Sequence, residues 1–309
     1  MAHSQSSVGS YLSCQKMYEL QYIDRCKPEE KFMPHLEFGS MAHKVLEDAG
    51  RLRDNIEAGL PDYQVCIPSE LSYPMLKDYF NIMSWNRYFI RICQRVAEYE
   101  KALIENLNKK TSSGLEIFRE KKFTISSGYT EPHTGVIDLL FLSNDRQHAI
   151  IMDYKFSTKV KTQEDFDYNV QLYLYAYFVN KEYGVPLKNI QIGYIDIIKQ
   201  DHSEPVVLAS GKLSKNKAQN VLYEDYIDKI IELELDIDEY RDFLDELKLK
   251  DVAYISLESI DENNYNVLVK SYLEAVDDIE LKKAQKKPFL RKVDSYSCSE
   301  CRFKEYCRR

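Results

Sequence analysis

The chain has 309 residues and a formal net charge of −8, and 44% of its residues are hydrophobic. This length and composition can bury a substantial core, which excludes a disordered chain, and seven unevenly spaced cysteines argue against a disulfide framework. The sequence holds no run of eighteen apolar residues and no basic-then-apolar start, so we expect a soluble cytoplasmic protein without membrane association.

The acidic charge is concentrated in one segment. Residues 221–280 hold 19 Asp and Glu against 5 Lys and Arg, a balance of −14, which leaves +6 for the rest of the chain. Residues 282–309 hold 10 Lys and Arg against 3 Asp and Glu. The total charge is therefore compatible with a phosphate-facing surface, although a solvated basic tail explains the same residues equally well.

The first hundred residues are expected to be helical. Residues 8–24, 38–53 and 73–108 have apolar residues at helical spacing, and turns around Pro28 and Pro34 separate the first two segments. The buried stripe of the third helix is expected to hold Trp85, Tyr88, Phe89, Ile92 and Val96. This third helix is expected to pack over a sheet.

After Gly114 the pattern changes to strands. Residues 115–126, 135–142 and 148–154 are short β-rich runs separated by the turn-forming sequences SSGYTEPHTG and SNDRQ. This order predicts a three-strand meander.

A further helix and two further strands are predicted after the meander. Residues 163–183 return to helical spacing before Gly184, and residues 190–198 and 205–209 resemble strands. The acidic segment 221–280 alternates charged and apolar residues at helical spacing and is interpreted as helical. The predicted fold class is α/β, a sheet with covering helices.

We expect one domain over residues 1–309. Within it, residues 39–110 form N-terminal helices, residues 114–210 the catalytic core and residues 211–287 an acidic helical region. The ends, residues 1–30 and 288–309, are distinguished by their cysteines.

Two carboxylates and one lysine are predicted to meet at one edge of the sheet. Asp138 lies on one expected strand, and Asp153 and Lys155 lie two residues apart on the next, so the latter two point to the same face. Mg²⁺ binds a few carboxylate oxygens and retains water ligands, as phosphodiester hydrolysis requires. Lys155 could orient or deprotonate the attacking water, or offset charge on the phosphate. A lone Asp-x-Lys tripeptide is weak evidence for a catalytic site, because an ordinary exposed strand can carry the same residues.

Further motifs occur in a fixed order around these residues. They are Gly39-x-x-x-His43, Gly135-x-x-Asp138, Asp153-x-Lys155 and Gln171-x-x-x-Tyr175. Gln171 and Tyr175 share a helix face at this spacing, although Tyr175 could also fill a core and His43 could be a surface histidine.

In this order the motifs resemble the RecB-like branch of the PD-(D/E)XK nucleases. The resemblance implies a restriction-endonuclease-like mixed sheet flanked by helices, with helical insertions. It also implies Mg²⁺ or Mn²⁺ held by His43, Asp138 and Asp153, catalysis by Lys155, and DNA contacts from Gln171 and Tyr175.

Members of this branch often carry a glutamate on the strand before the Gly-x-x-Asp strand. Glu116 and Glu120 both qualify, and Glu120 is preferred as a catalytic residue because Glu-x-x-Phe followed by a hairpin is the closer resemblance. The acidic residue of the Asp-x-Lys motif is Asp rather than the commoner Glu.

Four cysteines near the chain ends form a candidate metal site. Cys298, Cys301 and Cys307 have ligand spacing, and Cys14 is the natural fourth ligand because the N-terminus of a helix favours a thiolate. The donor set alone leaves Zn²⁺ and an iron–sulfur cluster open. Cys26, Cys66 and Cys93 are interpreted as packing residues.

This arrangement of cysteines resembles that of iron–sulfur nucleases, including AddB-type helicase–nucleases and CRISPR-associated RecB-like nucleases. It implies a 4Fe-4S cluster joining the two ends, with a mainly structural role. The basic C-terminal residues that the cluster would position against DNA are Arg302, Lys304, Arg308 and Arg309.

The resulting hypothesis is a metal-dependent DNA exonuclease acting on single strands or DNA ends in recombination, repair, or phage or CRISPR DNA processing. No Walker A sequence occurs, so unwinding would require a helicase or another recombination or adaptation protein as partner. The alternative is a DNA-binding or assembly subunit with little cleavage of its own. An electron-transfer protein is the third possibility.

Overall fold

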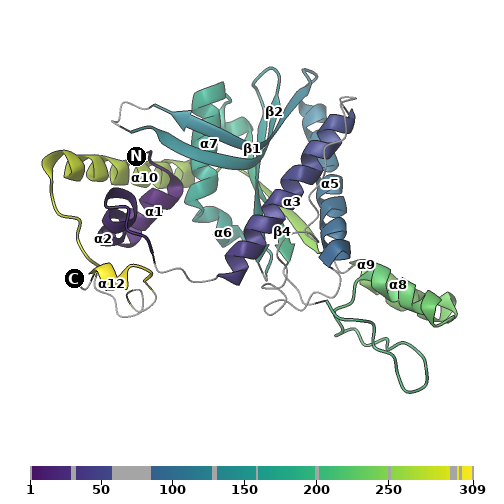
Figure 1. The fold of residues 1–309 in the computed structure, drawn as a ribbon. Helices are drawn as coiled ribbons and strands as arrows, with labels where there is room; N and C mark the ends of the chain where they lie inside the picture. Colours follow the sequence, from purple (N-terminus) through teal and green to yellow (C-terminus); the bar gives the residue numbers. More distant parts are fainter. Residues whose placement is uncertain are drawn as a thin grey trace.

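A five-stranded sheet with a helical layer on each face forms the centre of the protein (Figure 1). The computed structural model describes residues 2–28, 33–57, 85–126, 131–157, 159–198, 202–249, 252–292, 298 and 301–307. The strands lie in the order β1 (Leu115–Ile125), β2 (His133–Ser143), β3 (Ala149–Ser157), β4 (Ile190–Ile198) and β5 (Ala253–Ser259).

The sheet is mixed because its connections differ in length. Short connections make β1, β2 and β3 an antiparallel meander, as the sequence predicted. The connection from β3 to β4 passes through α6 (Gln163–Asp167) and α7 (Val170–Tyr183), and these two strands are therefore parallel. The single helix expected over residues 163–183 is interrupted between α6 and α7, where Asn169 caps α7.

The fifth strand corrects the helical interpretation of the acidic segment. Ala253, Ile255 and Leu257 alternate along β5 and pack in the core, while β5 pairs with β4 in antiparallel register. The strand expected at residues 205–209 is wrong, since Val207 makes only an isolated bridge to Leu213.

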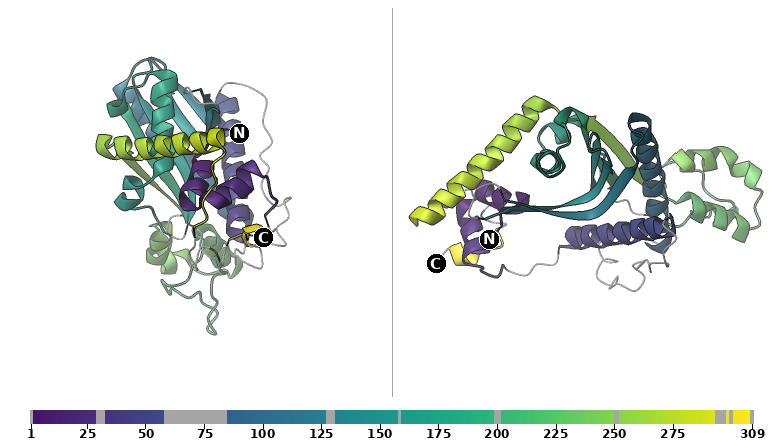
Figure 2. Two further views of the ribbon diagram at one scale, coloured as in Figure 1. Left: turned by 90° about the vertical axis from the view of Figure 1, so that its left-hand side faces the viewer. Right: turned by 90° about the horizontal axis from the view of Figure 1, so that it is seen from above.

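Helices cover both faces of the sheet (Figure 2), and the side chains on each face form a core of their own. On one face lie α7, α10 (Glu262–Gln285) and α1 (Gln5–Ser13). On the other lie α3 (Pro34–Glu57) and α5 (Trp85–Lys110), and the predicted stripe residues Tyr88, Phe89, Ile92 and Val96 are all buried there. Part of the helix expected over residues 73–108 lies outside the described residues.

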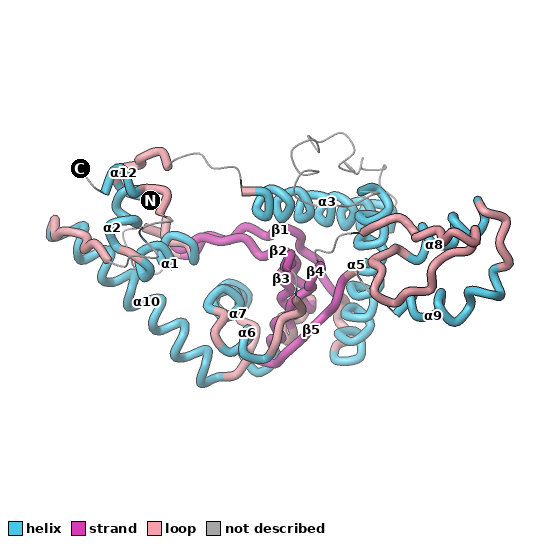
Figure 3. The backbone as a smooth tube through the Cα atoms, turned by 90° about the horizontal axis from the view of Figure 1, so that it is seen from below, coloured by secondary structure: helices cyan, strands magenta, loops and turns pink. Residues whose placement is uncertain are grey.

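The two chain ends meet beside α10. The helix expected over residues 8–24 is broken at Cys14, which has extended backbone between α1 and α2 (Gln15–Tyr18), and a π-helix follows (Glu19–Ile23). Lys16 N donates to the Leu290 carbonyl at 3.1 Å, and Leu290 N donates to Gln15 Oε1 at 3.0 Å. The short helix α12 (Lys304–Cys307) lies beside α2 (Figure 3).

A small helical unit extends from the sheet edge near α5 (Figure 1). It contains α8 (Tyr223–Glu232), α9 (Arg241–Leu249) and the 3-10 helix Ile237–Tyr240, packed around a separate cluster that includes Tyr226 and Phe243. A second 3-10 helix, Leu187–Asn189, precedes β4. None of the helices within the described ranges is both long and apolar enough to cross a membrane.

Gly193 in β4 occupies a position that a larger residue would overfill. An added Cβ would lie 2.4 Å from the Ser256 carbonyl oxygen of β5 and 2.8 Å from the sulfur of Met152 in β3. We predict that Gly193→Ala lowers the free energy of unfolding by about 1–3 kcal/mol, measured by urea denaturation. Gly9→Ala is the control, because its Cβ meets nothing closer than 3.9 Å. Equal stability of Gly193→Ala and wild type would contradict close packing at β4.

Candidate active site

The site begins where strands β2 and β3 separate. Their register runs only from Leu142 opposite Ala149 to Leu139 opposite Met152. One residue further along β2, the Asp138 carboxylate accepts the backbone N–H of Tyr154 at 2.8 Å. A side chain thus replaces the backbone partner that the diverging strand no longer provides, and it fixes Asp138 at the split.

The Asp153 carboxylate lies in the same split and is held by the neighbouring side chains. Asp153 and Lys155 form an ion pair, and the Lys155 ammonium also donates to Gln171 Oε1 at 3.2 Å. Gln171 Nε2 donates to Asp153 Oδ1 at 3.2 Å and to the Tyr175 hydroxyl at 2.6 Å. The expected meeting of Asp-x-Lys with the Gln-x-x-x-Tyr helix is therefore observed, with Gln171 joining the two motifs.

Glu120 is an irregular residue of β1, and its side chain lies at the site. Arg119 pairs with Leu139 and Lys121 with Ile137, so the intervening Glu120 lies opposite Asp138. The backbone of Glu120 has φ 49, in the left-handed region that residues other than glycine rarely adopt. Opposed acidic side chains in a sheet repel each other, so a positive charge between them is favourable.

His43 of α3 lies beside these two acids. Its Nδ1 is 3.6 Å from Asp138 Oδ2 and 3.8 Å from Glu120 Oε1. Ligand atoms of His43, Glu120 and Asp138 all lie within 4.8 Å of one another. One imidazole nitrogen and several carboxylate oxygens form a donor set suited to Mn²⁺, and the carboxylates also suit Mg²⁺.

The electrostatics of the buried carboxylates also favour a cation. Burial raises the pKa of Asp138 to about 7, and the charge of Asp153 acts in the same direction. Burial likewise raises the pKa of Asp153, although Lys155 opposes this. Burial lowers the pKa of His43, but its polar contact with Glu120 and the charge of Asp138 outweigh burial and leave that pKa raised. The three carboxylates therefore favour the binding of a cation between them.

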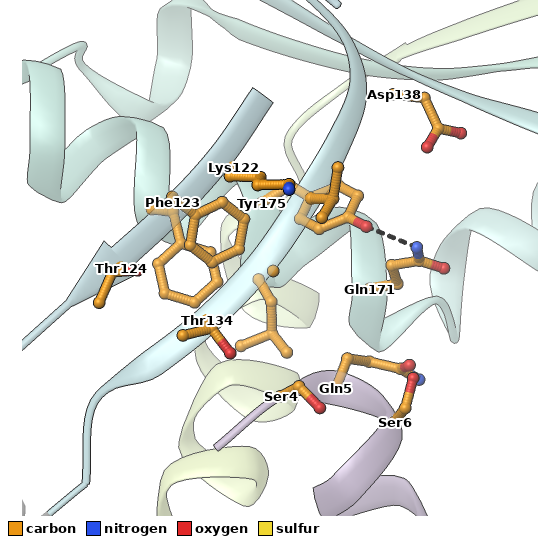
Figure 4. A pocket seen from close by; sticks show the side chains of 14 residues that line it. Ser4, Gln5, Ser6, Lys122, Phe123, Thr124, Thr134, Asp138, Gln171 and Tyr175 are labelled. Carbon is orange, nitrogen blue, oxygen red and sulfur yellow. Dashed lines mark hydrogen bonds between the residues drawn. The ribbon is translucent and has the colours of Figure 1, made fainter. Parts of the chain in front are cut away.

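A cavity of about 570 Å³ leads from Asp138 between the β1–β2 hairpin, α7 and the start of α1 (Figure 4). Gln171 and Tyr175 line it near Asp138, and hydroxyl, amide and ammonium groups line it further out. These outer polar residues are Ser4, Gln5, Ser6, Lys122, Thr124 and Thr134. The cavity gives an extended ligand access to the carboxylates.

The structure separates the remaining candidates from this site. Glu116, the other candidate glutamate, pairs with Arg146 at 2.7 Å and is absent from the carboxylate cluster found among the described residues. Arg302 and Lys304 lie with α12 at the chain ends, away from α3 (Figure 1). Arg308, Arg309 and Cys66 lie outside the described residues.

The four candidate cysteine ligands are partly exposed at the joined ends. Cys14 begins α2 without a side-chain capping bond, and Cys301 N donates to the Cys298 carbonyl at 3.4 Å. Cys307 is near enough to Lys16 to influence its pKa. The expected proximity of the two ends is observed, and the ligand set stays a prediction.

The sequence interpretation missed the outer wall of the cavity and the surroundings of Glu120. Lys122 and Ser4 to Ser6 lack any motif, and their position depends on how α1 lies against the hairpin. Arg119 was also missed, because a charged residue next to Glu120 gives no sequence signal that it is buried.

The PD-(D/E)XK nuclease superfamily model matches residues 2–308. No curated protein matches the chain. A solved Eubacterium rectale structure described as "Putative exonuclease" is 12% identical, covers 80% of this chain and 82% of its own, and has a TM-score of 0.34. The structure of SSO0001 is 13% identical, with coverages of 86% and 84% and a TM-score of 0.25.

Asp138→Asn should separate two effects of the buried carboxylate, namely its cost to the stability of the fold and its contribution to cation binding. The raised pKa of Asp138 means that the free energy of unfolding falls as pH rises from about 4 to about 7. We predict that at pH 8 in EDTA the variant is more stable than wild type by up to about 4 kcal/mol, because a pKa raised from 3.8 to about 7 is roughly three factors of ten in proton affinity, each about 1.4 kcal/mol.

Thermal unfolding with and without Mn²⁺ measures both effects. The asparagine oxygen can still accept the Tyr154 N–H, so the local fold should persist. Mn²⁺ should raise the melting temperature of wild type and not that of the variant. A variant less stable than wild type in EDTA at pH 8 would disprove the charge argument.

Proposed function

The chain belongs to the PD-(D/E)XK nuclease superfamily, and on this premise we propose that it is a Mg²⁺- or Mn²⁺-dependent deoxyribonuclease that hydrolyses single-stranded DNA or DNA ends. The observation that carries the proposal is the convergence of His43, Glu120, Asp138, Asp153 and Lys155. Exonuclease rather than endonuclease action is proposed from the resemblance to the RecB-like branch alone.

The cation would be held by His43, Glu120 and Asp138, with Asp153 as a further ligand. Bound there, a divalent cation lowers the pKa of a water molecule and offsets negative charge on the phosphate. The donor types fit this role, since the chain supplies carboxylate oxygens and one imidazole from four separate elements.

Lys155 is assigned the role of the catalytic lysine. Its ammonium is held between Asp153 and Gln171, so it is oriented before substrate binds. From this position it can donate to a phosphate oxygen and offset the charge that develops there. Gln171 and Tyr175 border the cavity and are assigned to DNA contact.

The cavity beside Asp138 supports a single strand as the bound form. Its volume of about 570 Å³ is that of a pocket for small ligands, so it can take nucleotides of one strand, whereas a duplex would stay outside. Lys122 and the surrounding hydroxyl groups can pair with phosphate oxygens. A double-stranded substrate would therefore be engaged at a frayed end.

A 4Fe-4S cluster bound by Cys14, Cys298, Cys301 and Cys307 is proposed as a structural element. Support comes from the approach of the two chain ends. There the rings of Tyr11, Tyr18 and Phe289 pack together, with centroids 5.6–6.1 Å apart. Zinc is the competing occupant. A helicase or another recombination or adaptation protein is the proposed partner, and Arg302 and Lys304 are proposed to contact DNA.

Lys155→Met tests the assignment of catalysis. We predict that it reduces DNA cleavage by about 10²- to 10³-fold, as expected when one positioned donor to a developing negative charge is removed, while Mn²⁺ binding persists. The measurement is digestion of end-labelled single- and double-stranded DNA with Mg²⁺ or Mn²⁺, with EDTA as the blank. Lys188→Met, at the 3-10 helix before β4, is the matched control and should cleave like wild type.

The outcomes distinguish the enzyme from the alternative function. Cleavage lost in Lys155→Met and in EDTA supports the nuclease, and the product ladder gives its polarity. A folded wild type that binds DNA and Mn²⁺ without cutting would instead support the DNA-binding or assembly subunit. The presence of Asp138, Asp153 and Lys155 argues against that alternative.

The cysteine site is tested by metal analysis of protein purified without oxygen. We predict iron and sulfide in wild type, with visible absorption, and loss of both in Cys14→Ser and Cys298→Ser. Cys26→Ser is the control, since Cys26 is another partly exposed cysteine near the N-terminus. A colourless wild type containing zinc would replace the cluster with a zinc site.

A further inference from the structure

We propose that Arg119 is a positioning residue for the candidate metal site, acting through its neighbour Glu120. This inference rests on the proposed function, because it concerns how one acidic side chain of that site is held. Arg119 lies on β1, and its side chain is only 4% exposed. Among the described residues the carboxylate cluster contains Glu120 but not Arg119, so we argue the effect of Arg119 through the β1 backbone that the two residues share.

Arg119 joins the strand to both helices of one layer. Its Nε and Nη2 donate to the two carboxylate oxygens of Asp54 on α3, at 2.8 and 3.0 Å. Its Nη1 and Nη2 donate to the two oxygens of Glu100 on α5, at 2.9 and 2.7 Å. Two paired hydrogen-bond sets fix the plane of the guanidinium group as well as its position. The strand is thereby held against α3 and α5 at this residue.

The bonds made by Arg119 explain the unusual backbone of Glu120. Consecutive side chains of a regular strand point to opposite faces. Arg119 nevertheless contacts Asp54 on α3, and the next residue, Glu120, approaches His43 on the same helix. The left-handed φ of 49 at Glu120 is the departure that turns both side chains toward α3. Such a conformation costs about 1–3 kcal/mol and persists only when surrounding contacts impose it, and the four bonds of Arg119 supply such contacts.

Gly50 on α3 has no side chain, and the guanidinium group of Arg119 occupies the space that a side chain would fill. A Cβ at Gly50 would lie 2.4 Å from Arg119 Cζ and Nε and 2.5 Å from Nη1. A free arginine tip could move aside, but this one is bound to two carboxylates. The space at Gly50, the paired hydrogen bonds of Arg119 and the turned backbone of Glu120 therefore form one arrangement, which places the Glu120 carboxylate beside His43.

The test measures Mn²⁺ affinity by calorimetry without DNA, in Arg119→Met and in Gly50→Ala. We expect each to weaken binding by about 10- to 100-fold, as loss of an outer partner of a metal ligand does. Arg119→Lys should recover part of the loss. Arg146→Met is the matched control, because Arg146 pairs with Glu116 on the same strand away from the site and should leave the affinity unchanged.

A double-mutant cycle separates positioning from general damage to the fold. If Arg119 acts through Glu120, adding Arg119→Met to Glu120→Gln should produce no further loss of Mn²⁺ affinity. An additive loss, or wild-type affinity in both Arg119→Met and Gly50→Ala, would overturn the positioning role. If Arg119→Met fails to fold, the cycle is run with Gly50→Ala. A wild type that binds no Mn²⁺ would overturn the proposed metal site and this inference with it.

Discussion

Mutual repulsion among buried carboxylates is the constraint on which the site depends. Asp138 and Asp153 occupy the split between β2 and β3, and Glu120 lies opposite Asp138 on the next strand. Three acids so close together are tolerated only with compensating positive charge, since burial makes the negative charges of Asp138 and Asp153 costly and the half-buried Glu120 adds a third. Lys155 and His43 supply part of that compensation, and a divalent cation bound there would supply the rest.

The rest of the fold keeps these acids together. The meander sets Asp138 next to β3, while the crossover through α7 brings Gln171 over the carboxyl end of the same strand. The opposite helical layer supplies His43 from α3 and holds β1 through Arg119. Both helical layers therefore contribute residues at one point of the sheet, and each is held to its face by an apolar core.

The sequence predicted the parts of the site that follow from regular periodicity. Asp153 and Lys155 share a strand face, and Gln171 and Tyr175 share a helix face, so their spacing alone brings them together. The geometry of Glu120 could not be predicted from spacing, because its φ depends on what Arg119 binds. Strand β5 was missed because AYISLES stands in an acidic segment otherwise helical, although its alternation is that of a half-buried strand.

The joining of the chain ends has a consequence for when the protein becomes complete during synthesis. His3 bonds to Glu280 at 3.0 Å, and Tyr11 bonds to Lys282 at 2.6 Å, so α1 is held by residues made more than 250 positions later. The carboxylates between residues 120 and 155 can assemble earlier, from strands adjacent in sequence. The segment Ser4 to Ser6 can pack beside β2 earlier, because His3 N donates to the Pro132 carbonyl and Thr134 N to the His3 carbonyl, but its contacts with α10 form only once α10 is made. A nascent chain could therefore gather the acids of the candidate site before α10 exists to hold α1 at the far end of the cavity.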